Sequence, residues 1–138
     1  MSYHTSEEDV QRLFKVASAT KEYSYSPYSK FRVGAAVLCR DGTIVGGTNI
    51  ENCSYPNGLC AERAAISSCI SQGHKDIVAI LVTSDIKDDF ITPCGFCRQF
   101  IVEFGNLEVI LTKATGEAKR MHITDILPMA FSPADLTK

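Results

Sequence analysis

Residues 77–83, Ile77-Val78-Ala79-Ile80-Leu81-Val82-Thr83, form a nearly continuous aliphatic run. A short run without polar alternation is typical of a strand that is covered on both faces. We therefore expect this strand at the centre of a sheet. Two segments with helical character flank it in the sequence, one from Cys60 to about Gln72 and one from Cys94 to near Gly105. The first is rich in small apolar side chains, so it can pack closely against the sheet.

Strands and helices alternate along the rest of the chain. Val33–Cys39 and Thr43–Thr48 are apolar runs separated by Arg40-Asp41-Gly42, and Asp-Gly between two such runs is a strong hairpin signal. Ser6 is a suitable N-cap for an amphipathic helix, and Leu107–Thr112 is a further short strand. This alternation predicts an α/β fold with helices on both faces of a mixed sheet.

The composition indicates one globular domain over residues 1–138. Hydrophobic residues make up 45% and charged residues 22%, and no apolar run reaches the ~20 residues that a membrane-spanning helix needs. The N-terminus has neither the basic nor the apolar region of a signal peptide, so we expect a cytoplasmic protein without a membrane partner. A formal net charge of −2 offers no electrostatic footprint for nucleic acid and favours a small substrate.

The cysteine pattern indicates a metal site. The chain has six cysteines, but disulfide frameworks belong mainly to short secreted proteins. The pair Cys94-x-x-Cys97 alone fits a redox pair, half of a structural zinc site or coincidence. The combination of Cys60-x-Glu62 with Pro93-Cys94-x-x-Cys97 is far more specific, because it matches the zinc deaminases that act on nucleobases. In that pattern the glutamate is an acid and base rather than a ligand.

Three cysteine ligands are the set expected of a catalytic zinc site, since structural zinc is usually closed by four ligands. Cys60, Cys94 and Cys97 all fall in predicted first helical turns, where the helix dipole favours thiolate. Three thiolates leave a net negative charge around Zn²⁺, and we hypothesise that Arg63 offsets part of it by donating to a ligand sulfur. With zinc-activated water and Glu62 as proton shuttle, the predicted reaction is hydrolytic deamination.

Four segments carry a resemblance to a known family: Ser26–Ala36, Asn49–Tyr55, Cys60–Arg63 and Pro93–Gln99. They resemble the small, zinc-dependent, homotetrameric cytidine deaminases of pyrimidine salvage, and the resemblance runs from about Tyr25 almost to the C-terminus. It implies a three-layer α/β/α sandwich with a mixed five-stranded sheet, the cytidine deaminase-like fold. It also implies a hydrolase of cyclic amidine C–N bonds that converts cytidine and deoxycytidine to uridine and deoxyuridine with release of ammonia.

The same resemblance implies a nucleoside pocket next to the zinc. Asn49 and Glu51 would form hydrogen bonds with the ribose, the backbone at Ala61 would lie near the base, and Phe31 would line the pocket. It agrees with the assignment of zinc to the three cysteines and of the proton shuttle to Glu62.

The resemblance further implies that sites are completed across subunit interfaces of a homotetramer. Tyr55 would help to complete a site at a subunit boundary, and Phe131 in the tail would stack on the base of a neighbour's substrate. Cys53 lies in the same loop as Tyr55, but it has neither an x-Glu partner nor a helix start, so we interpret it as a packing thiol. Cys39 and Cys69 fall in apolar elements and are predicted core residues.

Three rival interpretations remain open from the sequence. A zinc-binding interaction module would normally need a fourth ligand and has no use for Glu62. A polynucleotide deaminase would need a basic or aromatic surface for the strand. A zinc deaminase of another small aminated heterocycle, such as blasticidin S, would share the metal chemistry but have a different pocket. Asn49 and Glu51 favour a ribonucleoside over this last alternative.

Overall fold

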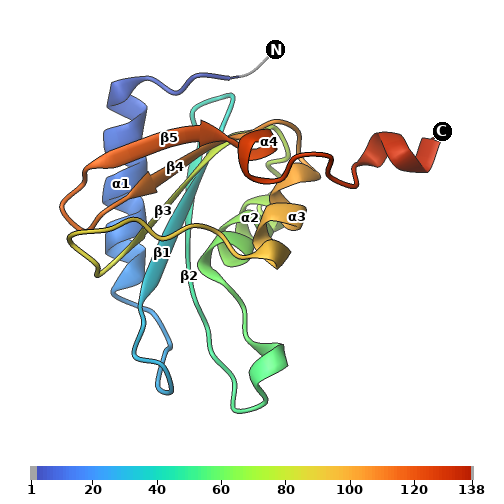
Figure 1. Cartoon of the computed structure of the whole chain (residues 1–138). Helices are drawn as coiled ribbons and strands as arrows, with labels where there is room; N and C mark the ends of the chain where they lie inside the picture. The colour runs from blue at the N-terminus through green and yellow to red at the C-terminus, as the bar shows by residue number, and fades with distance from the viewer. Residues whose placement is uncertain (1–2, 138) are drawn as a thin grey trace.

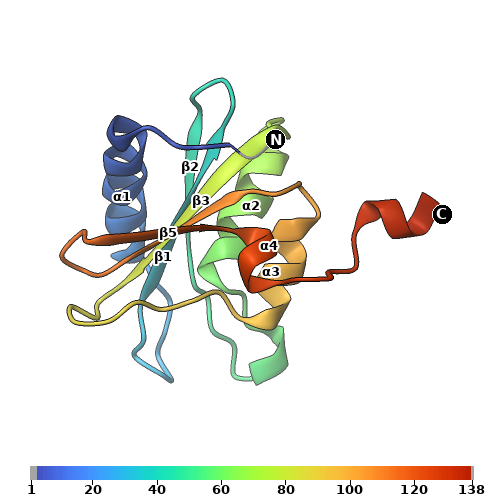
Figure 2. The ribbon, with the colours of Figure 1, turned by 45° about the horizontal axis from the view of Figure 1, so that its top comes forward.

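A five-stranded mixed sheet separates helix α1 from helices α2 and α3 in the computed structural model, which describes residues 3–137 (Figures 1 and 2). The strands lie in the order β2-β1-β3-β4-β5, and the predicted three-layer α/β/α architecture is confirmed. Met1, Ser2 and Lys138 belong to the predicted domain but lie outside the described residues. The elements are α1 (Glu7–Lys21), β1 (Val33–Cys39), β2 (Ile44–Thr48), η1 (Tyr55–Asn57), α2 (Ala61–Ser71), β3 (Ile77–Ser84), α3 (Gly95–Val102), β4 (Glu108–Thr112), β5 (Ala118–His122), α4 (Ile123–Ile126) and η2 (Pro133–Thr137).

The central strand is β3, as its aliphatic sequence predicts. It pairs antiparallel with β1 and parallel with β4, and every residue in it is buried. Successive side chains enter two separate cores: Ile80 packs with residues of α2 and α3, whereas Leu81 packs with residues of α1. Burial on both faces explains why this strand has no polar alternation.

Helices α2 and α3 cover the same face of the sheet, and each leads through a short connection into a strand. Those strands, β3 and β4, are parallel neighbours. Because each helix runs antiparallel to the strand that follows it, both helix N-termini lie toward the carboxyl ends of β3 and β4. Ligand sites of α/β sheets form at this edge.

The fifth strand is not apparent from the sequence pattern. Its residues, Ala118-Lys119-Arg120-Met121-His122, are mostly polar because β5 is an edge strand and stays partly exposed. Arg120 fixes its position by donating to both carboxylate oxygens of Glu108 on β4, at 2.8 and 3.1 Å. Glu108 is only 2% exposed. The strand is therefore held by a buried ion pair that hydrophobic periodicity does not detect.

The two ends of the chain differ in how they contact the sheet. Helix α1 begins as predicted: Oγ of Ser6 accepts a hydrogen bond from the Asp9 amide, and Val10 and Leu13 are buried. The C-terminal tail instead projects away from the sheet and ends in η2 (Figure 1). Within residues 3–137, the helices are too short or too polar to cross a membrane.

Candidate active site

Three cysteine sulfurs meet where helices α2 and α3 begin. Cys60 is the N-cap residue of α2, Cys94 is the N-cap residue of α3, and Cys97 lies in the first turn of α3. The three Sγ atoms lie within 4.8 Å of one another, with 3.8 Å between those of Cys60 and Cys94. The two predicted helix starts therefore converge, although each helix begins one residue later than predicted.

The charge around the cluster favours thiolate. Nη2 of Arg63 donates to Sγ of Cys60 at 3.6 Å. A hydrogen bond from Cys97 and the bond from Arg63 lower the pKa of Cys60 to about 5. The shared hydrogen bond and burial raise the pKa of Cys97. The contact with Arg63 thus favours a thiolate in the cluster, and binding of a metal would release the remaining thiol protons.

Glu62 is buried beside the sulfur cluster and is only 4% exposed. Desolvation raises the pKa of its carboxyl to about 7, and the negative charge of Cys60 acts in the same direction. A carboxyl that titrates near neutral pH can both take up and release a proton. Glu62 therefore has the protonation behaviour of a general acid and base.

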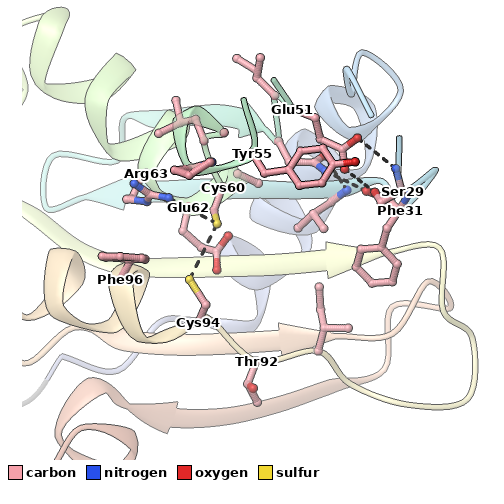
Figure 3. Close-up of a pocket in the computed structure, with 18 residues that line it drawn as sticks. Ser29, Phe31, Glu51, Tyr55, Cys60, Glu62, Arg63, Thr92, Cys94 and Phe96 are labelled. Carbon is pink, nitrogen blue, oxygen red and sulfur yellow. Dashed lines mark hydrogen bonds between the residues drawn. The ribbon is translucent and has the colours of Figure 1, made fainter. Parts of the chain in front are cut away.

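A cavity of about 550 Å³ connects this cluster to the loops at the end of the sheet. Cys60, Glu62 and Cys94 lie together in one part of it, whereas Glu51 and Phe31 lie in another (Figure 3). The first group comes from the helix starts and the second from the loops before β1 and after β2. The cavity thus brings a possible metal centre and a second polar region into one space.

The polar region offers one strong acceptor and one donor. Oε1 of Glu51 accepts from the amides of Tyr28 and Ser29, and Oε2 accepts from Oγ of Ser29. Oδ1 of Asn49 accepts from Ser24 and Val33, and its Nδ2 donates to the carbonyl of Phe31. After these bonds Asn49 retains one N–H, and Glu51 retains one acceptor position on Oε2. A ligand hydroxyl can use both.

Comparison with known proteins identifies the family. Residues 7–113 match the family described as "Cytidine and deoxycytidylate deaminase zinc-binding region". The chain belongs to this family. This membership confirms the prediction of a zinc-dependent deaminase hydrolase, which the position of Glu62 beside the sulfur cluster already favours.

Named relatives and solved structures agree with the family assignment. A "Probable cytidine deaminase" of Dictyostelium discoideum is 44% identical over 130 residues, which is 94% of this chain and 88% of that protein. A cytidine deaminase of Sporosarcina psychrophila is 43% identical over 94% of this chain and 96% of its own. The crystal structure of cytidine deaminase from Burkholderia pseudomallei superposes with a TM-score of 0.83 at 39% identity, over 92% of this chain and 100% of that one.

The cysteine cluster fits the metal that the family name implies. Three sulfur donors within 4.8 Å of one another suit zinc, and two of them, Cys60 and Cys94, line the cavity. Arg63 fits this arrangement because it supplies positive charge next to the thiolates. Its Nε is buried and has no hydrogen-bond partner among the described residues.

Most of the residues predicted to bind substrate line the cavity. The role of each stays a prediction; they are Phe31, Asn49, Glu51, Tyr55 and Ala61. Arg63, which was predicted to offset the charge of the thiolates, lines the same cavity. Phe131 does not line it in this chain: its side chain is 60% exposed, and its carbonyl accepts a hydrogen bond from Gln99. A contact between Phe131 and substrate would therefore require the site of another copy.

The cavity is also lined by residues to which the sequence analysis gave no role, among them Ser29, Ile91 and Thr92. Ile91 and Thr92 directly precede Pro93 and Cys94, so their closeness in sequence to a predicted ligand was a usable signal. Ser29 lies two residues before Phe31, so closeness to a predicted pocket residue was a signal here too, but its hydrogen bond with Glu51, 22 residues away, left none.

The other cysteines stay outside the cluster. Cys39 and Cys69 are buried core residues, as predicted, with Sγ atoms 3.4 Å apart. Cys53 is exposed, so the interpretation as a packing thiol was wrong, because its loop runs over the surface. The metal-like cluster found among the described residues contains neither Cys53 nor a histidine.

Proposed function

We propose that this protein catalyses the hydrolytic deamination of cytidine and 2′-deoxycytidine to uridine and 2′-deoxyuridine, with release of ammonia, in pyrimidine salvage. The observation that carries the proposal is the position of Glu62, buried beside three sulfurs in a cavity that also contains Asn49 and Glu51. The names of the relatives support the same reaction.

Cys60, Cys94 and Cys97 would hold a zinc ion. Bound there, zinc would supply a Lewis acid that makes water nucleophilic at neutral pH. Arg63 donates to Cys60 and so offsets part of the negative charge of the three thiolates. The positive ends of α2 and α3 act in the same direction.

Glu62 moves the protons of the reaction. It accepts a proton from the water that attacks the amino-bearing carbon and passes this proton to the adjacent ring nitrogen. As the C–N bond breaks, Glu62 relays the second proton of the water to the leaving amino group, which departs as ammonia. Cytidine and water are thereby converted to uridine and ammonia. A pKa near 7 suits both directions of transfer.

The rest of the cavity would bind the nucleoside. The backbone at Ala61 would contact the base and Phe31 would form a wall. A single sugar hydroxyl can accept from the free N–H of Asn49 and donate to the free acceptor position of Glu51. Among the described lining residues, Arg63 is the one cation, and it is engaged with Cys60. The described lining therefore offers a 5′-phosphate no uncommitted cation, and this favours nucleosides over deoxycytidylate as substrates.

We further propose a homotetramer whose sites are completed by neighbouring copies. The support is the exposure of large apolar side chains on the projecting tail and on α3: Phe131 is 60% exposed and Phe96 is 78% exposed. Tyr55 lines the cavity and is 75% exposed, so that it is accessible to a neighbouring copy whose site it would complete. Light scattering of the purified protein tests the mass. A monomer that is fully active at nanomolar concentration would contradict the proposal.

A cytoplasmic location is also part of the proposal. None of the six cysteines forms a disulfide, although the sulfurs of Cys39 and Cys69 lie 3.4 Å apart, and this is typical of a reducing compartment. The alternative of another small heterocycle, such as blasticidin S, is not favoured, because the relatives are named cytidine deaminases.

The deciding experiment measures ammonia release and bound zinc together. The purified protein is incubated separately with cytidine, 2′-deoxycytidine, deoxycytidylate, cytosine, adenosine and blasticidin S. We expect turnover of the first two and little of the others. Turnover of adenosine or blasticidin S without turnover of cytidine would overturn the proposed substrate. Bound zinc without release of ammonia would instead favour a zinc-binding module.

A further inference from the structure

The hydroxyl of Ser29 forms hydrogen bonds with two other residues that line the cavity. Its Oγ donates to Oε2 of Glu51 and accepts from the backbone N–H of Phe31 at 3.0 Å. The backbone N–H of Ser29 also donates to Oε1 of Glu51, at 3.1 Å. Figure 3 shows these bonds at the end of the cavity away from Cys94. One short side chain thus connects the carboxylate of Glu51 to the backbone of Phe31.

These bonds leave Glu51 a single acceptor position. An ionised carboxylate offers about four such positions. The amides of Tyr28 and Ser29 fill both positions on Oε1, and the hydroxyl of Ser29 fills one on Oε2. Ser29 has only one hydroxyl proton and commits it to Glu51. The remaining position on Oε2 can therefore accept one hydrogen bond from a ligand hydroxyl, and only from the side that the hydroxyl of Ser29 leaves open.

The same contacts keep Glu51 ionised. The hydrogen bond from the Ser29 hydroxyl, with those from the two amides, lowers the pKa of Glu51. An ionised carboxylate accepts hydrogen bonds and cannot donate them. The partner in the substrate must then be a donor, which a sugar hydroxyl is and an ether oxygen is not.

We propose that Ser29 is a positioning residue that sets the selectivity for a sugar hydroxyl, by fixing the one free acceptor of Glu51 and holding Phe31 beside it. This inference rests on the proposed nucleoside deaminase function. Because Ser29 lies away from Glu62 and the sulfur cluster, it acts on substrate binding and not on the chemical step. A side chain that only stabilised the loop would affect all substrates equally.

The test compares Ser29→Ala with Ser29→Thr, which retains a hydroxyl, and with Ser54→Ala as control. Ser54 lies in the neighbouring exposed loop, and its side chain makes no capping bond. Steady-state kinetics are measured with cytidine, 2′-deoxycytidine and 3′-deoxycytidine. A bond to a charged group is worth ~1.5–3 kcal/mol, so Ser29→Ala should raise KM for cytidine about tenfold or more with kcat within about twofold.

The decisive readout is a selectivity ratio, the kcat/KM for cytidine divided by the kcat/KM for a deoxy analogue. The analogue is whichever of 2′-deoxycytidine and 3′-deoxycytidine has the lower kcat/KM with the wild type. Ser29→Ala should reduce this ratio about tenfold, while Ser29→Thr restores most of it and Ser54→Ala leaves it unchanged. Both substrates are measured on one sample, so the ratio is independent of the folded fraction. An unchanged ratio in Ser29→Ala, or a fall in kcat alone, would overturn the inference.

A double-mutant cycle with Glu51→Gln separates positioning from direct contact. If Ser29 acts through Glu51, Ser29→Ala in the Glu51→Gln background should lower kcat/KM for cytidine little further than Glu51→Gln alone. Fully additive losses would mean that Ser29 does not act through Glu51, and the inference would fail. A wild type that releases no ammonia from any of the three nucleosides refutes the proposed function instead, so the two failures are distinguishable.

Discussion

Gly47 of β2 lies directly against Ala65 of α2: a Cβ at Gly47 would come within 2.3 Å of the Ala65 nitrogen. The helix that begins with Cys60 and Glu62 is therefore seated on the sheet at a position that only glycine permits. The adjacent Gly46 points to the opposite face, where a Cβ would come within 2.4 Å of Oγ1 of Thr20 and 2.9 Å of Cγ1 of Val16, both on α1 and away from the site. The two glycines thus provide a matched pair of sites.

Gly47→Ala should displace α2 and weaken both zinc binding and activity, because backbone atoms of the helix cannot move aside locally. Overpacking of this kind costs ~1–3 kcal/mol. Gly46→Ala should lower the melting temperature while the zinc content and the activity of the folded protein remain normal. Thermal unfolding, zinc content and kcat/KM are measured on both variants. Equal zinc affinity and activity in the two variants would show that the Gly47 contact does not position the site.

Glu62→Gln should retain zinc and lose nearly all turnover, because an amide can neither accept nor release the proton. General acid–base catalysis typically contributes ~10²–10⁴-fold, and the loss in kcat should be at least of that size. Zinc content and ammonia release from cytidine measure the two properties separately. A fully active Glu62→Gln enzyme would refute the catalytic assignment.

Cys94→Ser should lose the metal, because a serine hydroxyl stays protonated at neutral pH and is a poor zinc ligand. Cys53→Ser is the control, since Cys53 is exposed and lies outside the sulfur cluster. Zinc content after dialysis against a weak chelator should fall in the first variant and remain at the wild-type level in the second. Loss of zinc from Cys53→Ser would contradict the ligand set.

Arg63→Gln should lower kcat while most of the zinc stays bound. The guanidinium donates to Sγ of Cys60, and without it the three thiolates would reduce the acidity of the metal centre. We expect a lower kcat, and in the pH profile of kcat the rise on the acid side should move to higher pH. Unchanged activity in Arg63→Gln would rule out charge compensation by this residue.

The ion pair between Glu108 and Arg120 should make stability depend on acid pH. Burial alone raises the pKa of Glu108, but the hydrogen bonds from Arg120 and Thr5 outweigh it, and the net pKa is lowered. A lowered folded-state pKa stabilises the fold above the ordinary glutamate value of ~4.3, and this contribution disappears as the pH falls below that value.

Arg120→Met would leave a buried, unpaired carboxylate and should cost ~3 kcal/mol at pH 7. The difference in free energy of unfolding between the variant and the wild type should shrink as the pH falls from 5 to 3. The reason is that Glu108, without Arg120, becomes protonated at a higher pH than it does in the wild type. Urea unfolding at several pH values measures this. Stability curves that stay parallel over this range would contradict the role of Glu108.

Much of the fold could be predicted because its signals are local. The continuous run at Ile77–Thr83, the hairpin at Asp41-Gly42 and the capped helix after Ser6 all depend on a few neighbouring residues. The edge strand β5 could not be predicted in this way. Its place depends on the ladder with β4 and on Arg120 reaching Glu108, and neither contact leaves a hydrophobic period in the sequence.

By itself the sequence determined the chemistry of the site: Cys60-x-Glu62 and Cys94-x-x-Cys97 indicate a metal and a proton carrier because their spacings fix side chains on single helix starts. Only the tertiary structure decided how those groups behave. Glu62 has a pKa near 7 because the fold buries it beside Cys60, and Glu51 keeps one acceptor because Ser29 approaches it from a distant loop. Desolvation and hydrogen-bond partners depend on which segments meet in space, which the order of residues along the chain does not reveal.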